Sequence, residues 1–333
     1  MNEPSHVIAC VWDFDNTLIP GYMQVPMFKD YGIDEPTFWR TVNRLPAKLR
    51  SDGVRLADTL SYLNFVLTLV KKGRLPGLSK ARLTQYGQQL EYCPGVPEIF
   101  PLLKSALDED PFKAHGITLE HYVISSGHIE TIRGSKVAPY MESVFASEFL
   151  EEELSREADL FCGLENNKEP ENNRQMSLSD STFGNQAVGE VKQIGYAVDT
   201  TQKTRCLFEI NKGCNKNEAF DVNMVIEGNA RRIPFQNMIY IADGPSDIPA
   251  FSVVRGHGGR AFAVYHADHE EEFEQCDRML SSGRVDAYGP ADYREDSATT
   301  RWLKMHIQKI AKRIIEEDIK FAEQSGKPPE HFH

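Results

Sequence analysis

Residues 6–19 have the sequence HVIACVWDFDNTLI. Residues 6–12 are rich in apolar and β-branched side chains and stop abruptly at an acidic pair, Asp13 and Asp15. Such a run predicts a buried strand of a parallel sheet. Similar runs occur at residues 122–124, 144–146, 238–242 and 261–265. Helical patterns at residues 129–140, 203–212 and 248–254 alternate with these runs, which predicts an open, Rossmann-like α/β sheet with parallel strands.

Polar side chains follow three of the predicted strands at the point where each strand ends. Asp13 ends the first, Ser125 the second and Asp243 the run at 238–242. In open parallel sheets, ligands bind beyond the carboxyl ends of the strands. The pattern therefore predicts one shared site built from separate parts of the chain.

The region between the first two strands predicts a helical insertion. Helices are expected at residues 35–44, 53–72 and 79–90, and we assign residues 21–115 to a helical cap domain. Residues 1–20 and 116–333 form the predicted catalytic core. The core includes an irregular polar excursion at about 150–200, flanked by a hairpin, and an amphipathic helix at 299–321 that packs on the core.

Composition narrows the possible classes of protein. The formal net charge of -12 over 333 residues disfavours a nucleic-acid partner, since nucleic-acid binding needs basic surface. The six cysteines are scattered without a CxxC pair, which is typical of free thiols rather than a zinc site or disulfide framework. No secretory leader is recognised, and the apolar run at residues 60–70 is too short to span a membrane, so we expect a soluble, cytoplasmic protein without a membrane partner.

Asp13 and Asp15 project to the same side of an extended chain. Two carboxylates at that spacing repel each other unless a cation or a shared proton intervenes. One can then act as an ionised nucleophile while the other holds a proton as a general acid. Aspartate clusters also form turns, so the pair alone leaves a purely structural role open.

Three later segments complete a pattern. VISSGHIETI (123–132) supplies Ser125 after a strand, TTQKTRCLFEI (200–210) supplies Lys203 at a helix start, and IYIADGPSDIPAF (239–251) supplies Asp243 and Asp247. With the DxDNT stretch, these segments resemble, in order, the four signatures of the haloacid dehalogenase (HAD) superfamily, over residues 5–265. The helical insertion and the FASEF segment (145–149) are similar to the phosphoserine phosphatase branch with its type I cap.

The resemblance implies a role for each residue. Asp13 would be the nucleophile that accepts a phosphoryl group, and Asp15 the acid and base. Mg²⁺ would bind a carboxylate oxygen of Asp13, the backbone carbonyl of Asp15, and Asp243. Ser125, Ser126 and Lys203 would bind phosphoryl oxygens, and Asp247 would orient a metal-bound water or Lys203.

Alternatives remain for single residues. Lys192 competes with Lys203 as the site lysine, and Ser125 could cap a helix while Ser126 binds phosphate. Thr17 steadies the first loop and stands, with Asp247, among the supporting residues. His128 follows the second signature and is expected to be structural.

The resemblance also implies the reaction. An acid at position 15 favours a Mg²⁺-dependent phosphatase acting on a small phosphorylated metabolite, since the dehalogenases lack that acid. A phosphomutase or phosphotransferase, or a catalytically idle binding module on the same fold, stays open. Phosphoserine itself is disfavoured because IPGYMQVPMF (19–28) lacks the glutamate typical of that branch, and no acid occurs until Asp30. Basic residues at the start of the cap indicate either a solvated helix face or a place for an anionic substrate tail: Arg40, Arg44, Lys48, Arg50 and Arg55. The oligomeric state is left open.

Overall fold

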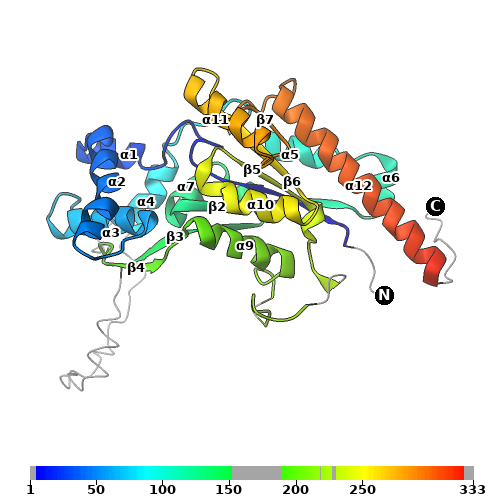
Figure 1. Ribbon diagram of the computed structural model, residues 1–333, viewed down its shortest axis with the longest axis horizontal. Coiled ribbons are helices and arrows are strands. Elements are labelled where there is room, and N and C mark those ends of the chain that lie inside the picture. The colour runs from blue at the N-terminus through cyan, green and yellow to red at the C-terminus, as the bar shows by residue number, and fades with distance from the viewer. Residues whose placement is uncertain (1–4, 152–188, 218, 227–229, 326–333) are drawn as a thin grey trace, which may run out of the picture.

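The protein forms a seven-stranded sheet covered by helices on both faces (Figure 1). The computed structural model describes residues 5–151, 189–217, 219–226 and 230–325. The strands are β1 (Val7–Trp12), β2 (Thr118–His128), β3 (Ser143–Leu150), β4 (Gln193–Tyr196), β5 (Met238–Ala242), β6 (Arg260–Tyr265) and β7 (Ala287–Pro290). Their order is β4-β3-β2-β1-β5-β6-β7, and all neighbours pair in parallel except β3 and β4. The predicted open α/β sheet is confirmed.

Helices connect the strands and continue to the end of the described chain. They are α1 (Val25–Tyr31), α2 (Glu35–Ser51), α3 (Asp58–Lys71), α4 (Lys80–Gly87), α5 (Ile99–Ser105), α6 (Asp110–Ala114), α7 (Ile129–Gly134), α9 (Thr200–Lys212), α10 (Ile248–Gly256), α11 (Glu270–Ser281) and α12 (Ala298–Ser325). None of the helices in these described ranges is long and apolar enough to cross a bilayer. Free thiols are found at Cys10, Cys93, Cys206, Cys214 and Cys276.

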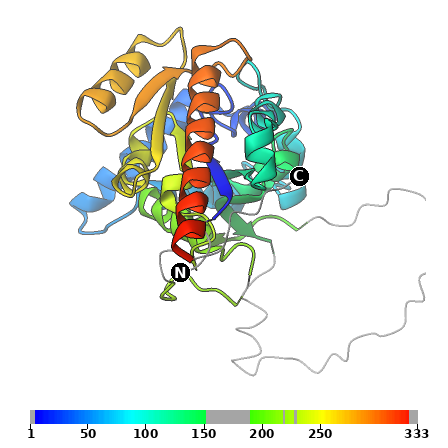
Figure 2. The same cartoon turned by 90° about the vertical axis from the view of Figure 1, so that its right-hand side faces the viewer.

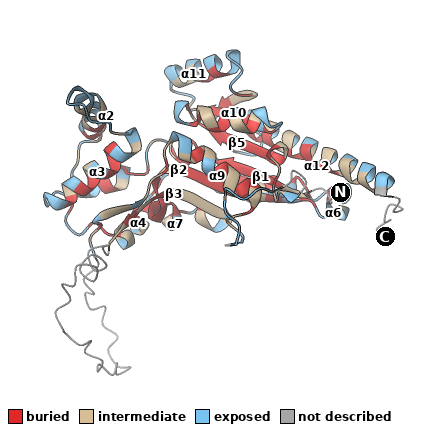
Figure 3. Ribbon diagram, turned by 60° about the horizontal axis from the view of Figure 1, so that its bottom comes forward, coloured by how far each residue is buried: buried red, intermediate tan, exposed pale blue. Residues whose placement is uncertain are grey.

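Strand β1 lies at the centre of the sheet and is buried on both faces. Ile8, Cys10 and Trp12 face a core shared with α5, α7 and α12, whereas Ala9 and Val11 face a core shared with α9, α10 and α11. This alternation follows from the two-residue period of a strand. Figure 3 shows the buried strands between helices whose outer surfaces are exposed, and Figure 2 shows α12 crossing one face of the sheet.

The C-terminal helix packs on the core, as the sequence predicts. Leu303, Ile307, Ile310 and Ile314 are buried in the cluster that contains β1, and Ile315 packs at its margin. The 299–321 periodicity therefore identified the buried face correctly.

The helical insertion has two parts. Helices α1 to α4 form their own apolar cluster, which also takes in Phe149 of β3 (Figure 1). Helices α5 and α6 lie inside the predicted insertion 21–115, yet Phe100, Leu103 and Phe112 pack against the sheet with α12. The unit with its own apolar cluster therefore ends near residue 90, because a helical period predicts a buried face but not its partner.

A hairpin flanks the polar excursion predicted at 150–200. Strands β3 and β4 pair antiparallel, with Phe149 opposite Ile194. The middle of this excursion, residues 152–188, lies outside the described residues. The flanking hairpin itself is confirmed.

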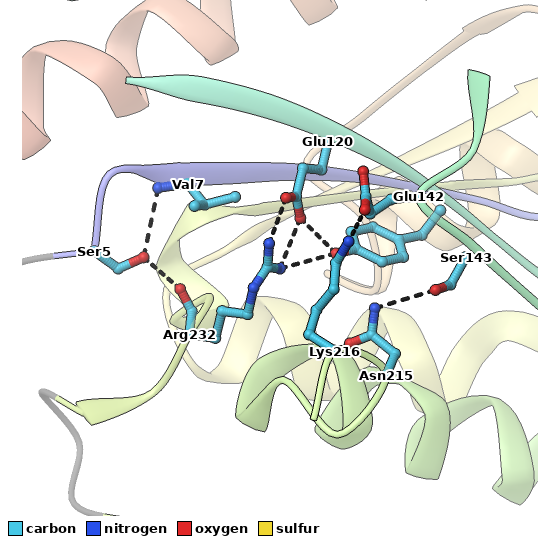
Figure 4. A network of polar contacts seen from close by, with 9 residues as sticks. Ser5, Val7, Glu120, Glu142, Ser143, Asn215, Lys216 and Arg232 are labelled. Carbon is cyan, nitrogen blue, oxygen red and sulfur yellow. Dashed lines mark hydrogen bonds and ion pairs between the residues drawn. The ribbon is translucent and has the colours of Figure 1, made fainter. Parts of the chain in front are cut away.

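A polar network ties the segment before β5 to the amino ends of β1 and β2 (Figure 4). Arg232 forms a two-pronged ion pair with Glu120, and its Nη1 lies 2.7 Å from Glu120 Oε2 and 3.0 Å from the hydroxyl of Tyr122. Ser5 donates to the carbonyl of Arg232, and Lys216 pairs with Glu142. Burial would raise the pKa of Glu120, but Arg232 and Tyr122 outweigh it and hold the pKa below its usual value. The network therefore holds this segment against the sheet through a charged, half-buried contact.

We expect Arg232→Met to lower the free energy of unfolding by about 1–3 kcal/mol, because Glu120 loses its charge-assisted partners. The stability of Arg232→Lys should lie between those of wild type and Arg232→Met, since lysine keeps the charge but not the two-pronged guanidinium geometry. The pKa of Glu120 is depressed in the folded protein. The greater stability of wild type over Arg232→Met should therefore be present at neutral pH and shrink as pH falls below about 4.3. Urea unfolding at pH 7 and pH 4 tests this, and equal stability of Arg232→Met and wild type at pH 7 would contradict it.

Candidate active site

The chain leaves β1 through a tight loop that presents Asp13 and Asp15. The Asp13 amide donates to the carbonyl of Ile241 at 2.8 Å, so the first aspartate is held beside the end of β5. Asn16 has a positive φ of 53°, and its amide donates to the carbonyl of Gly21 at 2.9 Å, closing the loop. Asparagine tolerates this left-handed conformation better than most residues. Asp15 Oδ1 accepts from the backbone amide of Met23 at 2.9 Å, which fixes the second carboxyl.

Lys203 reaches the same point from α9. Asp199 caps that helix by accepting from the amides of Thr201 and Gln202, which places Lys203 one turn inside it. Its Nζ lies 3.0 Å from Asp13 Oδ1 and 2.7 Å from Asp247 Oδ1, and the side chain is only 1% exposed. A lysine this deeply buried needs a charged partner, and here it has two.

Asp243 and Asp247 follow β5, the latter in the short 3-10 turn η4 (Pro245–Asp247). Carboxylate oxygens of Asp13, Asp243 and Asp247 all lie within 4.8 Å of one another. Asp247 is fully buried and also accepts from the hydroxyl of Tyr240 at 2.6 Å and of Ser246 at 2.8 Å. Because its two oxygens already receive these donors and Lys203, the contacts suit an orienting role for Asp247.

Ser125 and Ser126 lie on the neighbouring strand. β2 pairs with β1 in parallel, with Val123 opposite Trp12, so Ser125 lies at the same edge of the sheet as Asp13. Ser125 Oγ is buried and accepts from the amide of Gly127 at 3.1 Å, and the carbonyl of Ser126 accepts from Ser147 Oγ at 3.0 Å. β2 continues through this polar stretch to His128, so the strand is longer than the apolar run alone predicts.

Thr17 lies in the loop itself and is fully buried. Its carbonyl accepts from the hydroxyl of Tyr293 at 2.7 Å, and its Oγ1 has no hydrogen-bond partner among the described residues. Lys192, the competitor of Lys203, precedes β4, where its amide donates to the carbonyl of Leu150. The structure thus brings Lys203 to Asp13 and places Lys192 beside the hairpin.

Comparison with known proteins finds a sequence relative that matches almost the whole chain. An uncharacterized protein of Borreliella burgdorferi is 31% identical over 311 residues, which cover 92% of this chain and 99% of that protein. The two chains belong to one family. No family model matches the chain.

Solved structures with a similar arrangement include a HAD family hydrolase from Salmonella enterica serovar Typhi, with 13% identity, a TM-score of 0.47, and coverage of 86% of this chain and 68% of that one. A probable phosphoserine phosphatase from Vibrio cholerae has 11% identity and a TM-score of 0.47, and the match covers 93% of this chain and 68% of that protein. In our structure, the signature residues at positions 13, 203, 243 and 247 meet at one edge of a parallel sheet, in the expected chain order. This is the arrangement that the resemblance to the haloacid dehalogenase superfamily predicts.

Buried carboxyl groups dominate the electrostatics of this site. Burial raises the pKa of Asp13 to about 6, against the opposing effect of Lys203, and burial together with Asp13 raises the pKa of Asp15 to about 8. Burial, Asp13 and Asp247 raise the pKa of Asp243 well above its usual value. Burial would lower the pKa of Lys203, but the two aspartates outweigh it and raise the pKa, so the amine stays charged. One lysine could not offset four ionised carboxyls, so a further cation would favour their ionised forms.

His128 links the cap to the core. Its Nε2 makes a short hydrogen bond with the hydroxyl of Tyr62 on α3, which in turn accepts from Gln24 Nε2 at 2.9 Å. Burial lowers the pKa of His128 to about 3, so the ring is neutral at physiological pH. These contacts support the structural role expected for His128.

Several contributors were missed in the sequence. Tyr240 lies inside β5 and has the pattern of a core residue, and Met23, Gln24 and Tyr62 belong to the insertion, where only helical packing was predicted. Gln275 of α11 donates to the carbonyl of Asp243 at 3.3 Å. No local signal marks these residues, because their partners lie far away along the chain.

Proposed function

We propose that this chain is a Mg²⁺-dependent phosphatase that moves the phosphoryl group of a small phosphorylated metabolite first to Asp13 and then to water. The observation that carries the proposal is the contact of the buried Lys203 amine with Asp13, beside a second carboxyl, Asp15, whose pKa burial and Asp13 raise to about 8. A nucleophile next to a proton donor is the pair that phosphomonoester cleavage requires.

The donor set fits Mg²⁺. Asp13 and Asp243 would hold the ion through carboxylate oxygens, together with the backbone carbonyl of Asp15, and hard oxygen ligands are those that Mg²⁺ prefers. When bound, the ion supplies positive charge that lowers the repulsion between the nucleophile and a phosphate dianion. The contacts of Asp247 with Lys203, Tyr240 and Ser246 would keep the lysine amine in place.

The two aspartates then divide the chemistry. Ionised Asp13 forms a bond from its carboxylate oxygen to phosphorus while the ester P–O bond breaks, and Asp15 gives its proton to the leaving oxygen. Asp15, now ionised, takes a proton from water as that water attacks phosphorus and the bond to Asp13 breaks. Both aspartates end in their starting states, and the products are an alcohol and inorganic phosphate.

Phosphoryl oxygens would be held by Ser125, Lys203 and backbone amides after Asp13, with Ser126 beside them and Thr17 steadying the loop. Lys203 offsets charge on the phosphoryl group as well as on Asp13. Placing these donors on two strand ends and a helix keeps them fixed during reaction.

Helices α1 to α4 would close over the substrate. A cavity of about 170 Å³ is lined by residues that follow the Asp13 loop in the chain, among them Ile19, Tyr22, Val25 and Lys29. This size suits a small diffusible molecule rather than a folded protein. Its lining contains one acid, Glu91, but none within residues 19–28, where the phosphoserine branch typically carries its glutamate, so phosphoserine is not proposed. The basic residues that begin the cap, from Arg40 to Arg55, are exposed, which favours a solvated face.

The test is hydrolysis of p-nitrophenyl phosphate by the purified full chain, with Mg²⁺, with excess EDTA, and after Mg²⁺ is restored. We expect activity that EDTA abolishes and Mg²⁺ returns, followed by a defined preference in a panel of phosphorylated metabolites. Transfer to an added alcohol or sugar phosphate in preference to water would instead indicate a phosphotransferase or mutase. Absence of turnover with every phosphoester in the panel would indicate a binding module.

Asp15→Asn should slow turnover by about 10²- to 10⁴-fold and lengthen the life of the phosphoenzyme, because asparagine neither donates nor accepts the proton. In wild type, the acid must be protonated, so we expect activity limited by leaving-group protonation to fall as pH rises through about 8. A pH–rate profile of both proteins with a poor leaving group checks this. An unchanged phosphoenzyme lifetime in Asp15→Asn would contradict the base role.

A further inference from the structure

A second cluster of metal-binding side chains lies where β6 passes into α11. Its members are His266, His269 and Glu272, whose ligand atoms all lie within 4.8 Å of one another. His266 Nδ1 lies 3.0 Å from Glu272 Oε2, and His269 Nδ1 lies 2.6 Å from Glu272 Oε1. Two imidazoles therefore turn the same ring nitrogen toward opposite oxygens of one carboxylate.

We propose that these three residues bind one divalent transition metal ion of the Zn²⁺ class, separate from the carboxylate site of Asp13. Zn–N and Zn–O bonds of about 2.0–2.1 Å in a tetrahedron put neighbouring ligand atoms about 3.3 Å apart. The distances of 2.6 and 3.0 Å would need to widen by about 0.7 and 0.3 Å to admit an ion. Two imidazoles and a carboxylate suit Zn²⁺, Co²⁺ or Ni²⁺, whereas the all-oxygen site suits Mg²⁺.

The surroundings support the orientation of the ligands. The other nitrogen of His266, Nε2, lies 3.8 Å from the sulfur of the buried Cys93. A metal on Nδ1 leaves the proton on Nε2, which then donates to that sulfur, and such outer partners hold a ligating ring in place. His269 is 60% exposed at its side chain, so an ion can enter from solvent and water can take the fourth position.

A contact between the helix and the preceding chain explains only part of this arrangement. Glu272 is the third residue of α11 and accepts from the backbone amide of His266 at 2.8 Å, which ties the helix to the end of β6. That contact accounts for the carboxylate but not for two imidazoles converging on it. His6 and His115 also flank one carboxylate, that of Asp318, at 3.0 Å each. The ligand atoms of His6, His115 and Asp318 do not all lie within 4.8 Å of one another, so these three residues provide a matched comparison.

The position of the cluster links it to the candidate active site. β6 pairs with β5, which ends next to Asp243, and Gln275 of α11 donates to the carbonyl of Asp243. The amide of Cys93 donates to the carbonyl of Leu18 in the loop after Asp15. An ion at the first turn of α11 would therefore fix a helix that contacts the backbone of a proposed Mg²⁺ ligand.

Equilibrium dialysis of Zn²⁺ against chelator-treated full-length protein tests the proposal. Wild type and Asp243→Asn should both retain the ion, which distinguishes this site from the catalytic carboxylates and makes the result independent of any phosphatase activity. His269→Gln should weaken the binding by more than about 100-fold, since even outer partners of a ligand are worth about 10- to 100-fold. Glu272→Gln should weaken it similarly, while the amide oxygen can still accept from the backbone amide of His266.

His115→Gln is the matched control and should bind as wild type does. Circular dichroism without metal should show the same fold in all variants, because His269 is exposed. Undiminished Zn²⁺ binding in both His269→Gln and Glu272→Gln, or no Zn²⁺ bound by Asp243→Asn, overturns the proposal.

Discussion

Asp13→Asn lowers kcat by about 10⁴-fold or more, because an amide oxygen cannot form the bond to phosphorus that the proposed mechanism requires. The fold is retained, since Lys203 still pairs with Asp247 at 2.7 Å and asparagine has the size of aspartate. Steady-state hydrolysis of p-nitrophenyl phosphate at saturating Mg²⁺, with circular dichroism in parallel, measures both parts of the prediction.

Asp286→Asn is a suitable control for this loss. Asp286 precedes β7 and pairs with Arg255 at 3.2 Å, at the amino ends of the strands and away from Asp13. Its kcat should match wild type even if its stability changes. Turnover of Asp13→Asn close to wild type, after exclusion of deamidation by mass spectrometry, would rule out Asp13 as the nucleophile.

Lys203→Met should lower the free energy of unfolding by about 3–5 kcal/mol, since removing one partner of a buried ion pair leaves the other charges uncompensated. The carboxyls of Asp13 and Asp247, both buried, would then face each other without a cation between them. Lys203 is a group that lowers the pKa of Asp13, so its loss raises that pKa further above the unfolded value. The deficit is therefore present at pH 7 and should shrink as pH falls toward 4.

Urea unfolding in EDTA at pH 7 and pH 4.5 measures the effect. Lys304→Met, which removes a surface lysine 3.7 Å from Glu295, should change stability by less than about 0.5 kcal/mol. The double variant Asp13→Asn/Lys203→Met should recover part of the loss, because one of the unpaired carboxylates is gone. A Lys203→Met variant as stable as wild type at pH 7 would contradict the buried pairing.

The sheet and its active edge were largely predictable, because the chemistry of the chain changes sharply where each strand ends. The ranges predicted for β1, β5 and β6 match the structure within one residue. Asp13 and Asp243 were found as polar residues at strand ends, whereas Lys203 and Asp247 were found through the resemblance to the HAD signatures, and the structure brings all four together. Local sequence carries this information, since strand period and helix capping act over a few residues.

Contacts between distant segments were not predictable in the same way. Tyr240 looks like any core residue of a buried strand until Asp247 is seen beside its hydroxyl. Strand β7, with the sequence AYGP, contains glycine and proline and has no strand signal without β6 to pair with. Helix α5 was assigned to the insertion because its periodicity says nothing of α12, against which it packs. Each of these features depends on tertiary packing.

Trapping the covalent intermediate tests the central claim most directly. Asp15→Asn protein would be mixed with p-nitrophenyl phosphate and Mg²⁺, quenched in acid, reduced with borohydride and digested for mass spectrometry. Reduction converts an aspartyl phosphate to homoserine, and we predict homoserine at position 13, with no conversion when substrate is omitted. Release of p-nitrophenol in the same sample without homoserine at position 13, or with the modification at another residue, would contradict the account.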